Sequence, residues 1–72
     1  MGFNNANPSA TAVAKRYMKM AMGHTAKVVD RLFRGNDAMV LFDNELAVVL
    51  TVIDDVWEVV NETDIEDFNR NK

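Results

Sequence analysis

The first half of the chain repeats its apolar or small residues at the spacing of an α-helix. These residues recur three and four positions apart, at Ala14, Met18, Ala21, Thr25, Val28 and Leu32. A single stripe of this kind is typical of a helix that packs one side on a core. Asn7 and Pro8 are start signals for a helix, and Gly35 is a stop signal. The pattern therefore predicts an amphipathic helix over residues 8–34, with a flexible tail over residues 1–7.

A helix of this length does not fit inside a domain of this size. About 27 helical residues would extend for about 40 Å, whereas a compact chain of 72 residues has a radius of gyration of about 11 Å. Two alternatives follow. The helix breaks near Gly23, with Thr25 capping a second helix, or it continues and buries its overhang against another chain.

The second half of the chain consists of short apolar runs. Residues 38–42, 46–53 and 56–60 are apolar segments, and acidic turn sequences separate them. About half of residues 46–60 are β-branched, which favours strands. The runs therefore predict a three-stranded antiparallel meander. Residues 45–61 also satisfy a helical period, so an all-α fold is the alternative.

The end of the chain has a helix signal of its own. Thr63 and Glu66 stand at the spacing of a capping box, which predicts a short C-terminal helix with Ile65 and Phe68 on one side. A long helix, a meander and a short helix make an α+β fold. We place all of it in a single small domain over residues 8–72, because so short a chain has apolar surface for one core.

The run over residues 46–53 is apolar on both faces of the expected strand. One face would carry Leu46, Val48, Leu50 and Val52, and the other Ala47, Val49 and Ile53. The long helix can cover one face, but a terminal helix of two turns is all that remains for the other. Because a large exposed apolar patch usually marks an interaction surface, we predict a partner or homodimer interface. Its candidate residues are Val49, Ile53 and Trp57.

Charge is distributed unevenly along the chain. Residues 1–36 carry six basic residues and one acidic residue, residues 37–72 carry ten acidic and two basic, and the net charge is −3. On the expected helix the basic side chains lie opposite the apolar stripe and include Arg16, Lys19, Lys27, Arg31 and Arg34. Such a basic face is most simply a solvated surface. It would also suit an acidic protein or the phosphates of a nucleic acid, which the acidic half would repel.

Few residues are candidates for catalysis. The sequence has no cysteine and a single histidine, His24, with no partner at the spacing of a catalytic or metal-binding motif. The acidic residues lack the order of a calcium loop. We therefore expect no enzyme activity, no metal and no cofactor. The lack of cysteine fits a reducing compartment, so we expect a cytoplasmic protein, and no apolar run is long enough to span a membrane.

Binding is the class of function that remains. We expect a small non-enzymatic regulator, inhibitor or adaptor that contacts another protein, itself or both. Compact, motif-free chains of this kind occur among phage-encoded and accessory proteins that modulate a larger host enzyme, which is an analogy and no more. A nucleic-acid-binding protein that uses the basic face is the alternative.

Overall fold

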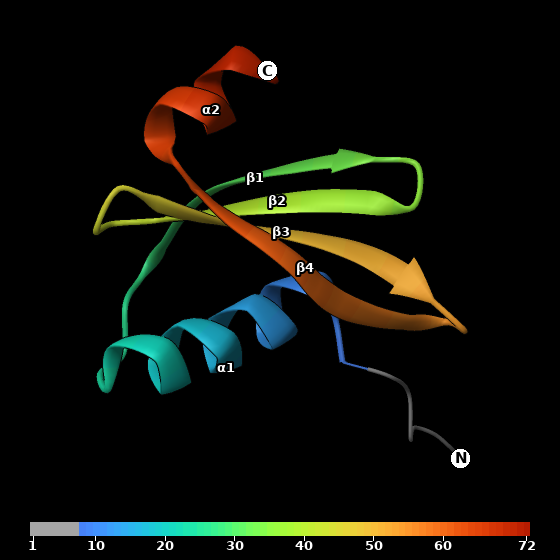
Figure 1. Cartoon of the computed structure of the whole chain (residues 1–72), viewed down its shortest axis with the longest axis horizontal. Helices are drawn as coiled ribbons and strands as arrows, with labels where there is room; N and C mark the ends of the chain where they lie inside the picture. Colours follow the sequence, from blue (N-terminus) through green and yellow to red (C-terminus); the bar gives the residue numbers. More distant parts are fainter. Residues whose placement is uncertain (1–7) are drawn as a thin grey trace.

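In the computed structural model, which describes residues 8–72, two helices pack on a four-stranded antiparallel sheet. The elements in chain order are α1 (Ala10–Met22), β1 (Val28–Arg34), β2 (Asp37–Phe42), β3 (Leu46–Ile53), β4 (Val56–Asp64) and α2 (Ile65–Arg70). The strands lie in the order β1-β2-β3-β4, and α1 and α2 lie on opposite faces of the sheet (Figure 1). The predicted α+β class is confirmed, and the all-α alternative is wrong.

α1 begins two residues after the predicted start at Pro8. Ser9 is the N-cap, because its side-chain oxygen accepts a hydrogen bond of 3.2 Å from the backbone N–H of Ala12. Pro8 therefore precedes the helix. The tail predicted over residues 1–7, with Asn7 as the cap, lies outside the described residues.

The predicted helix over residues 8–34 is wrong in its second half. Gly23 has a φ of 78°, and its N–H donates a hydrogen bond of 2.8 Å to the carbonyl of Lys19, which closes α1 with a left-handed cap. The break near Gly23 is confirmed. A strand follows it, so Thr25 caps no second helix.

β1 replaces the second half of the expected helix because residues 28–34 pair with β2, with a bulge at Val29. Val28, Asp30 and Leu32 are half-buried, while Val29 and the other residues between them are exposed. Gly35 does not end a helix. It has a φ of 59° and begins the two-residue turn between β1 and β2.

The meander has four strands instead of the predicted three, because β1 joins it. Three residues connect β2 to β3, and the last of them, Glu45, has a φ of 70°. Asp54 and Asp55 connect β3 to β4, with φ values of 53° and 65°. Two consecutive positive φ values are typical of a type I′ hairpin turn.

The C-terminal helix is confirmed, but its cap is one residue later than predicted. The Asp64 side chain accepts a hydrogen bond of 3.0 Å from the N–H of Asp67. Thr63 belongs to β4 and does not cap the helix.

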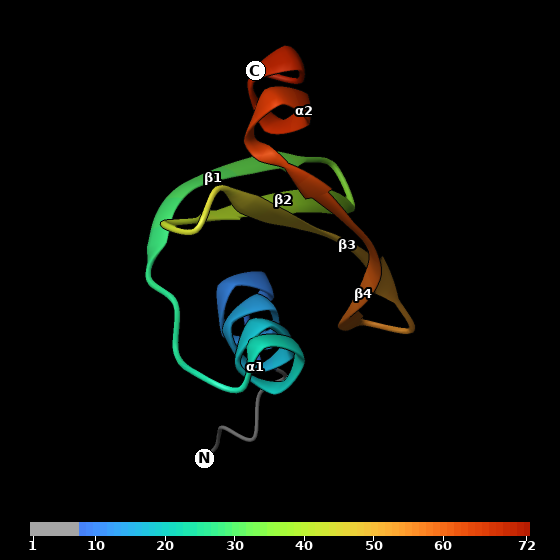
Figure 2. The same cartoon turned by 60° about the vertical axis from the view of Figure 1, so that its left-hand side comes forward.

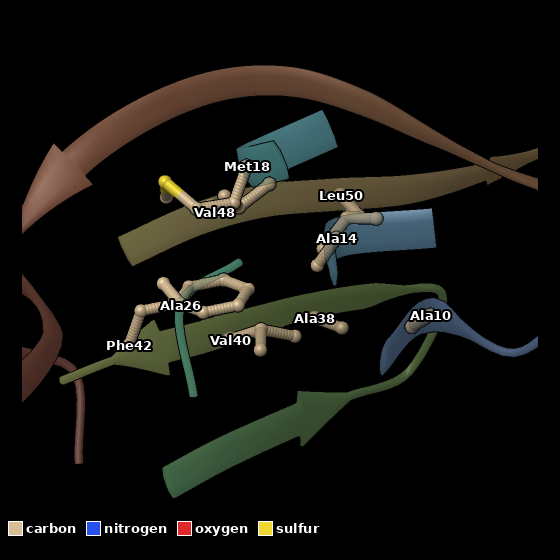
Figure 3. Packing of buried hydrophobic residues seen from close by; sticks show 9 residues of the cluster. All are labelled: Ala10, Ala14, Met18, Ala26, Ala38, Val40, Phe42, Val48 and Leu50. Carbon is tan, nitrogen blue, oxygen red and sulfur yellow. The ribbon is translucent and has the colours of Figure 1, made fainter. Parts of the chain in front are cut away.

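The main core lies between α1 and one face of the sheet. Ala10 and Ala14 are small enough to let the helix approach the strands closely, and Met18 fills the remaining space. The sheet supplies the larger side chains, among them Val48, Leu50 and Phe42 (Figure 3). Figure 2 shows the sheet curving around α1.

A second, smaller core lies on the opposite face, under α2. Leu41, Ala47 and Phe68 are buried there, and Leu32, Met39 and Ile65 pack against them. The predicted separation of residues 46–53 into two faces is confirmed, because Leu46, Val48 and Leu50 pack in the main core and Ala47 packs under α2.

Candidate protein-binding face

α2 covers one end of its sheet face and leaves the other end open. Figure 1 shows α2 above the end where β4 finishes, away from the turn between β3 and β4. The uncovered part, which we call the open half-face, is formed by apolar side chains of all four strands: Leu32, Met39, Val49, Ile53 and Val60. Val60 is 54 % exposed and Ile53 is 47 % exposed. Water therefore contacts Val60 beside α2 and, beyond the pair of Thr51 and Glu58, Ile53.

The open half-face is hollowed next to the end of α2. Leu32, Met39, Val49 and Val60 line a hollow of about 320 Å³, together with polar groups at its margin. Val60 is the extra residue at a bulge, where the register of β4 against β3 shifts. Apolar side chains with a few polar groups beside them are typical of binding sites.

Four residues form a row across the sheet at the margin of the hollow. Arg34 pairs with Asp37, Asp37 with Thr51, and Thr51 with Glu58. Directly paired residues on neighbouring strands share a face, so this charged row lies on the same face as Val49. It begins with a cation on β1 and ends with an anion on β4.

Polar contacts fasten the end of α2 to β1. The Arg34 guanidinium donates a hydrogen bond of 2.7 Å to the carbonyl of Asn71. The Lys72 ammonium lies 2.8 Å from a carboxylate oxygen of Asp30 and 5.5 Å from the centre of the Phe68 ring. The hydrogen bond from Lys72, and then that from the backbone N–H of Arg31, hold the pKa of the Asp30 carboxyl below its usual value.

The three apolar residues predicted for the interface do not form one surface. Val49 and Ile53 both belong to the open half-face. Trp57 lies on the opposite face, half-buried against the main core. Its ring meets that of Phe33 edge-on, with centroids 6.0 Å apart. Trp57 therefore helps to close the main core, and the structure does not bring it together with the other two.

The basic residues are not on a single helical face either. Arg16 and Lys19 are exposed on α1, and Lys27 lies in the connection to β1. Arg31 pairs with Val40, on the α1 face of the sheet, whereas Arg34 lies on the opposite face. The basic face expected from a continuous helix is wrong, because that helix ends at Gly23.

His24 is exposed just after α1, and its Nδ1 lies 3.5 Å from the carbonyl of Thr25. Among residues 8–72, no group of three or more His, Cys, Asp or Glu side chains is placed to hold a metal ion. Within the same residues, no helix is long and apolar enough to cross a membrane.

Sequence reasoning missed several residues of the open half-face. The pattern predicts Leu32 on a helix and gives no binding role to Met39 or Val60, nor to Glu58 in the charged row. Met39 lies within the apolar run over residues 38–42, which does not by itself show which side chains face α2. Val60 reaches this face through a bulge, and no local sequence pattern predicts that bulge.

Comparison with protein-family models, curated proteins and solved structures finds no match for this chain.

Proposed function

We propose that this protein is a small non-enzymatic binding protein, a regulator, inhibitor or adaptor, that contacts other protein surfaces through its open half-face. The observation that carries the proposal is the exposure of Val60 at the hollow, together with that of Ile53 farther along the same face. Fully burying a Val or Ile side chain stabilises by about 1.5–3 kcal/mol. Since both are about half exposed, a protein that covers them recovers roughly 1 kcal/mol at each. The lack of cysteine keeps the cytoplasm as the expected compartment.

Capture from cells that contain the protein tests this proposal. Tagged wild-type protein, Val49→Lys and Lys15→Glu are each used as bait, with nuclease-treated controls, and bound proteins are identified by mass spectrometry. Val49→Lys places a charge at the hollow, so we expect loss of the bound proteins. Lys15 is exposed on α1, so Lys15→Glu should bind like the wild type. Equal capture by all three baits would contradict a binding role for the open half-face.

Nucleic-acid binding is the second proposal, with less support. Arg16 and Lys19 still form a short exposed basic patch on α1, but the other three basic candidates lie elsewhere. A triple reversal, Arg16, Lys27 and Arg31 to Glu, should abolish any salt-sensitive retardation of DNA or RNA. Absence of retardation by the wild type at low salt would end this proposal.

A further inference from the structure

We infer that copies of this chain associate head to tail, with the outer side of α1 in one copy docked on the open half-face of the next. The outer side of α1 carries three exposed residues, which we call the α1 patch: Arg16, Lys19 and Met20. Met20 enters the hollow, and the two cations lie against Asp37 and Glu58 of the charged row. The inference rests on the proposed function, since it names the partner of the same face.

The α1 patch exposes an apolar side chain beside two positive charges. Met20 is 79 % exposed, more than any other large apolar side chain in residues 8–72. Arg16 lies one helical turn before it, and Lys19 is its neighbour in the chain. All three lie away from the side of α1 that buries Ala14 and Met18. Within residues 8–72 neither cation forms an ion pair, so both charges are available to a partner.

The open half-face has the complementary pattern, an apolar hollow beside negative charges. Apolar side chains from all four strands line the hollow, and methionine is flexible enough to fill an irregular apolar space. The charged row at its margin contains two anions, Asp37 and Glu58, and one cation, Arg34. The Arg34 guanidinium already donates a hydrogen bond to the carbonyl of Asn71. No ion pair of the described chain engages either anion, so both suit a basic partner.

The shape of α1 suits the space beside α2. α2 stands over the middle strands, where Phe68 packs on Leu41 and Ala47, so a second sheet cannot lie flat on this face. A single helix can dock there, because a helix projects about 10 Å from the sheet that carries it. Thr51 is four residues along β3 from Ala47, a distance of about 13 Å. Two packed helices need about 8–10 Å between their axes, so α1 of another copy fits over Thr51 beside α2.

Charge disfavours a symmetric contact between two α1 patches. Such a contact would bring the cations of both copies together, and like charges facing each other across an interface are costly. The contact between the α1 patch and the open half-face joins two different surfaces, so it is heterologous. Each added copy then leaves one α1 patch and one open half-face free. Association should therefore continue beyond a dimer.

Two variants, each blocked on one surface, test the inference. Met20→Glu places a carboxylate in the α1 patch, and Val60→Lys places an ammonium group at the hollow. Sedimentation equilibrium of the wild type should give an average mass that rises past that of a dimer as the concentration increases. For each variant alone, the dissociation constant should be at least about tenfold higher.

An equimolar mixture of the two variants should form a mixed dimer and no larger species. Val60→Lys keeps an intact α1 patch, and Met20→Glu keeps an intact open half-face, so one productive contact is possible between them. The dissociation constant of that dimer should lie within about threefold of the wild-type value. A variant that fails to fold could not restore the contact. Both substituted side chains are more than half exposed, so neither change should disturb the core.

Two charge reversals show whether the contact depends on the cations of the α1 patch. Lys19→Glu should weaken association at low salt, and its effect should shrink at 1 M salt, because exposed charges are then screened. Lys27→Glu makes the same change in charge in the connection between α1 and β1, outside the α1 patch. It should associate like the wild type.

A wild type that stays monomeric at high micromolar concentration would overturn the inference, and so would a mixture no tighter than the single variants. Loss of association in only one of the two variants would indicate a symmetric contact and would overturn it as well. The proposed function fails separately. If Val49→Lys still loses captured proteins while the wild type is a monomer, the face binds another protein and only the inference is wrong. If Val49→Lys changes neither capture nor self-association, both are wrong.

Discussion

α1 covers its face of the sheet with 13 residues, and α2 covers the opposite face with six. Under α1, small residues on the helix meet large residues on the strands, and the aromatic contact between Phe33 and Trp57 adds to that core. Under α2, one aromatic side chain, Phe68, is fully buried, and the hollow opens beside it. The α1 face is therefore the more fully covered of the two, although Phe33 at its edge stays 59 % exposed.

The difference separates stability from binding. A face that is covered within the chain contributes its apolar burial to folding. A face left partly open can contribute the same kind of free energy to association. We therefore expect substitutions on the α1 face to change unfolding and substitutions on the open half-face to change binding. The following predictions test that division, beginning with the largest effect.

Phe42→Ala should lower the free energy of unfolding by about 3–5 kcal/mol, because it leaves a cavity in the main core. Phe42 is 1 % exposed and is among the largest fully buried side chains. Val60→Ala on the open half-face is the control, and it should cost less than about 1 kcal/mol, since Val60 already contacts water. Chemical denaturation at a concentration that keeps the protein monomeric measures both. Equal losses would contradict the contrast between the two faces.

Phe68→Ala should have a smaller effect, of about 2–3 kcal/mol, although Phe68 is also fully buried. α2 has two turns, so it can detach while the sheet and α1 stay folded, and local opening limits the cost. Hydrogen exchange should then speed up for residues 65–70 and remain slow in β2 and β3. Uniformly faster exchange in the sheet would show instead that α2 and the main core unfold together.

The two faces also differ in how far the sequence predicts them. β-branched side chains favour a strand over residues 46–53, and the two-residue period of a strand then assigns each side chain to a face. Both features act locally, so a sequence pattern reveals them. The incomplete cover was also predicted, because a short helix is the only other element that the pattern over residues 61–72 indicates.

β1 could not be predicted in this way. Val28 and Leu32 are four residues apart, which fits one face of a helix, but the bulge at Val29 places them on opposite faces of β1. Pairing with β2 decides between helix and strand, and that pairing is a tertiary interaction. The charged row is even harder to predict from the sequence. Its residues are up to 24 positions apart, and the register that aligns them depends on where the bulges fall.

One residue beside each helix has a left-handed backbone conformation, so these two positions allow a matched pair of substitutions. Gly23, at the end of α1, has a φ of 78°, and Glu45, whose carbonyl accepts the hydrogen bond from Ile65 N–H at the start of α2, has a φ of 70°. Glycine adopts this conformation without steric cost and other residues do not. Gly23→Ala should therefore destabilise by about 1 kcal/mol, and Glu45→Gly should stabilise by about 0.5–1 kcal/mol. Thermal denaturation measures both, and a loss of stability in Glu45→Gly would show that its side chain matters more than its backbone.

Low pH should destabilise the packing of α2 on the sheet first. The pKa of Asp30 is lowered in the folded protein by the hydrogen bond from Lys72 and then by that from the Arg31 N–H. Its contribution to stability is therefore present above the unfolded pKa, near 3.9, and is lost as the pH falls through the lower folded pKa. In Asp30→Asn this part of the pH dependence should disappear. Hydrogen exchange in residues 65–70, followed from pH 5 to 2, measures it, and an unchanged acid limb in Asp30→Asn would contradict the assignment.

High pH should instead destabilise the contact between α1 and β4. The Tyr17 hydroxyl donates a hydrogen bond of 2.8 Å to the Glu62 carboxylate on β4, and this bond, followed by desolvation and the charge of Glu62, raises the Tyr17 pKa. Its contribution to stability is complete below the unfolded pKa, near 10, and is lost as the pH rises through the higher folded pKa, because a tyrosinate would repel Glu62. Tyr17→Phe should show a shallower fall in melting temperature above pH 10 and an unchanged acid limb. Since Tyr17 is partly exposed, we expect this effect to be the smallest of the series. A fall as steep as that of the wild type would mean that other groups titrate at the contact between α1 and β4.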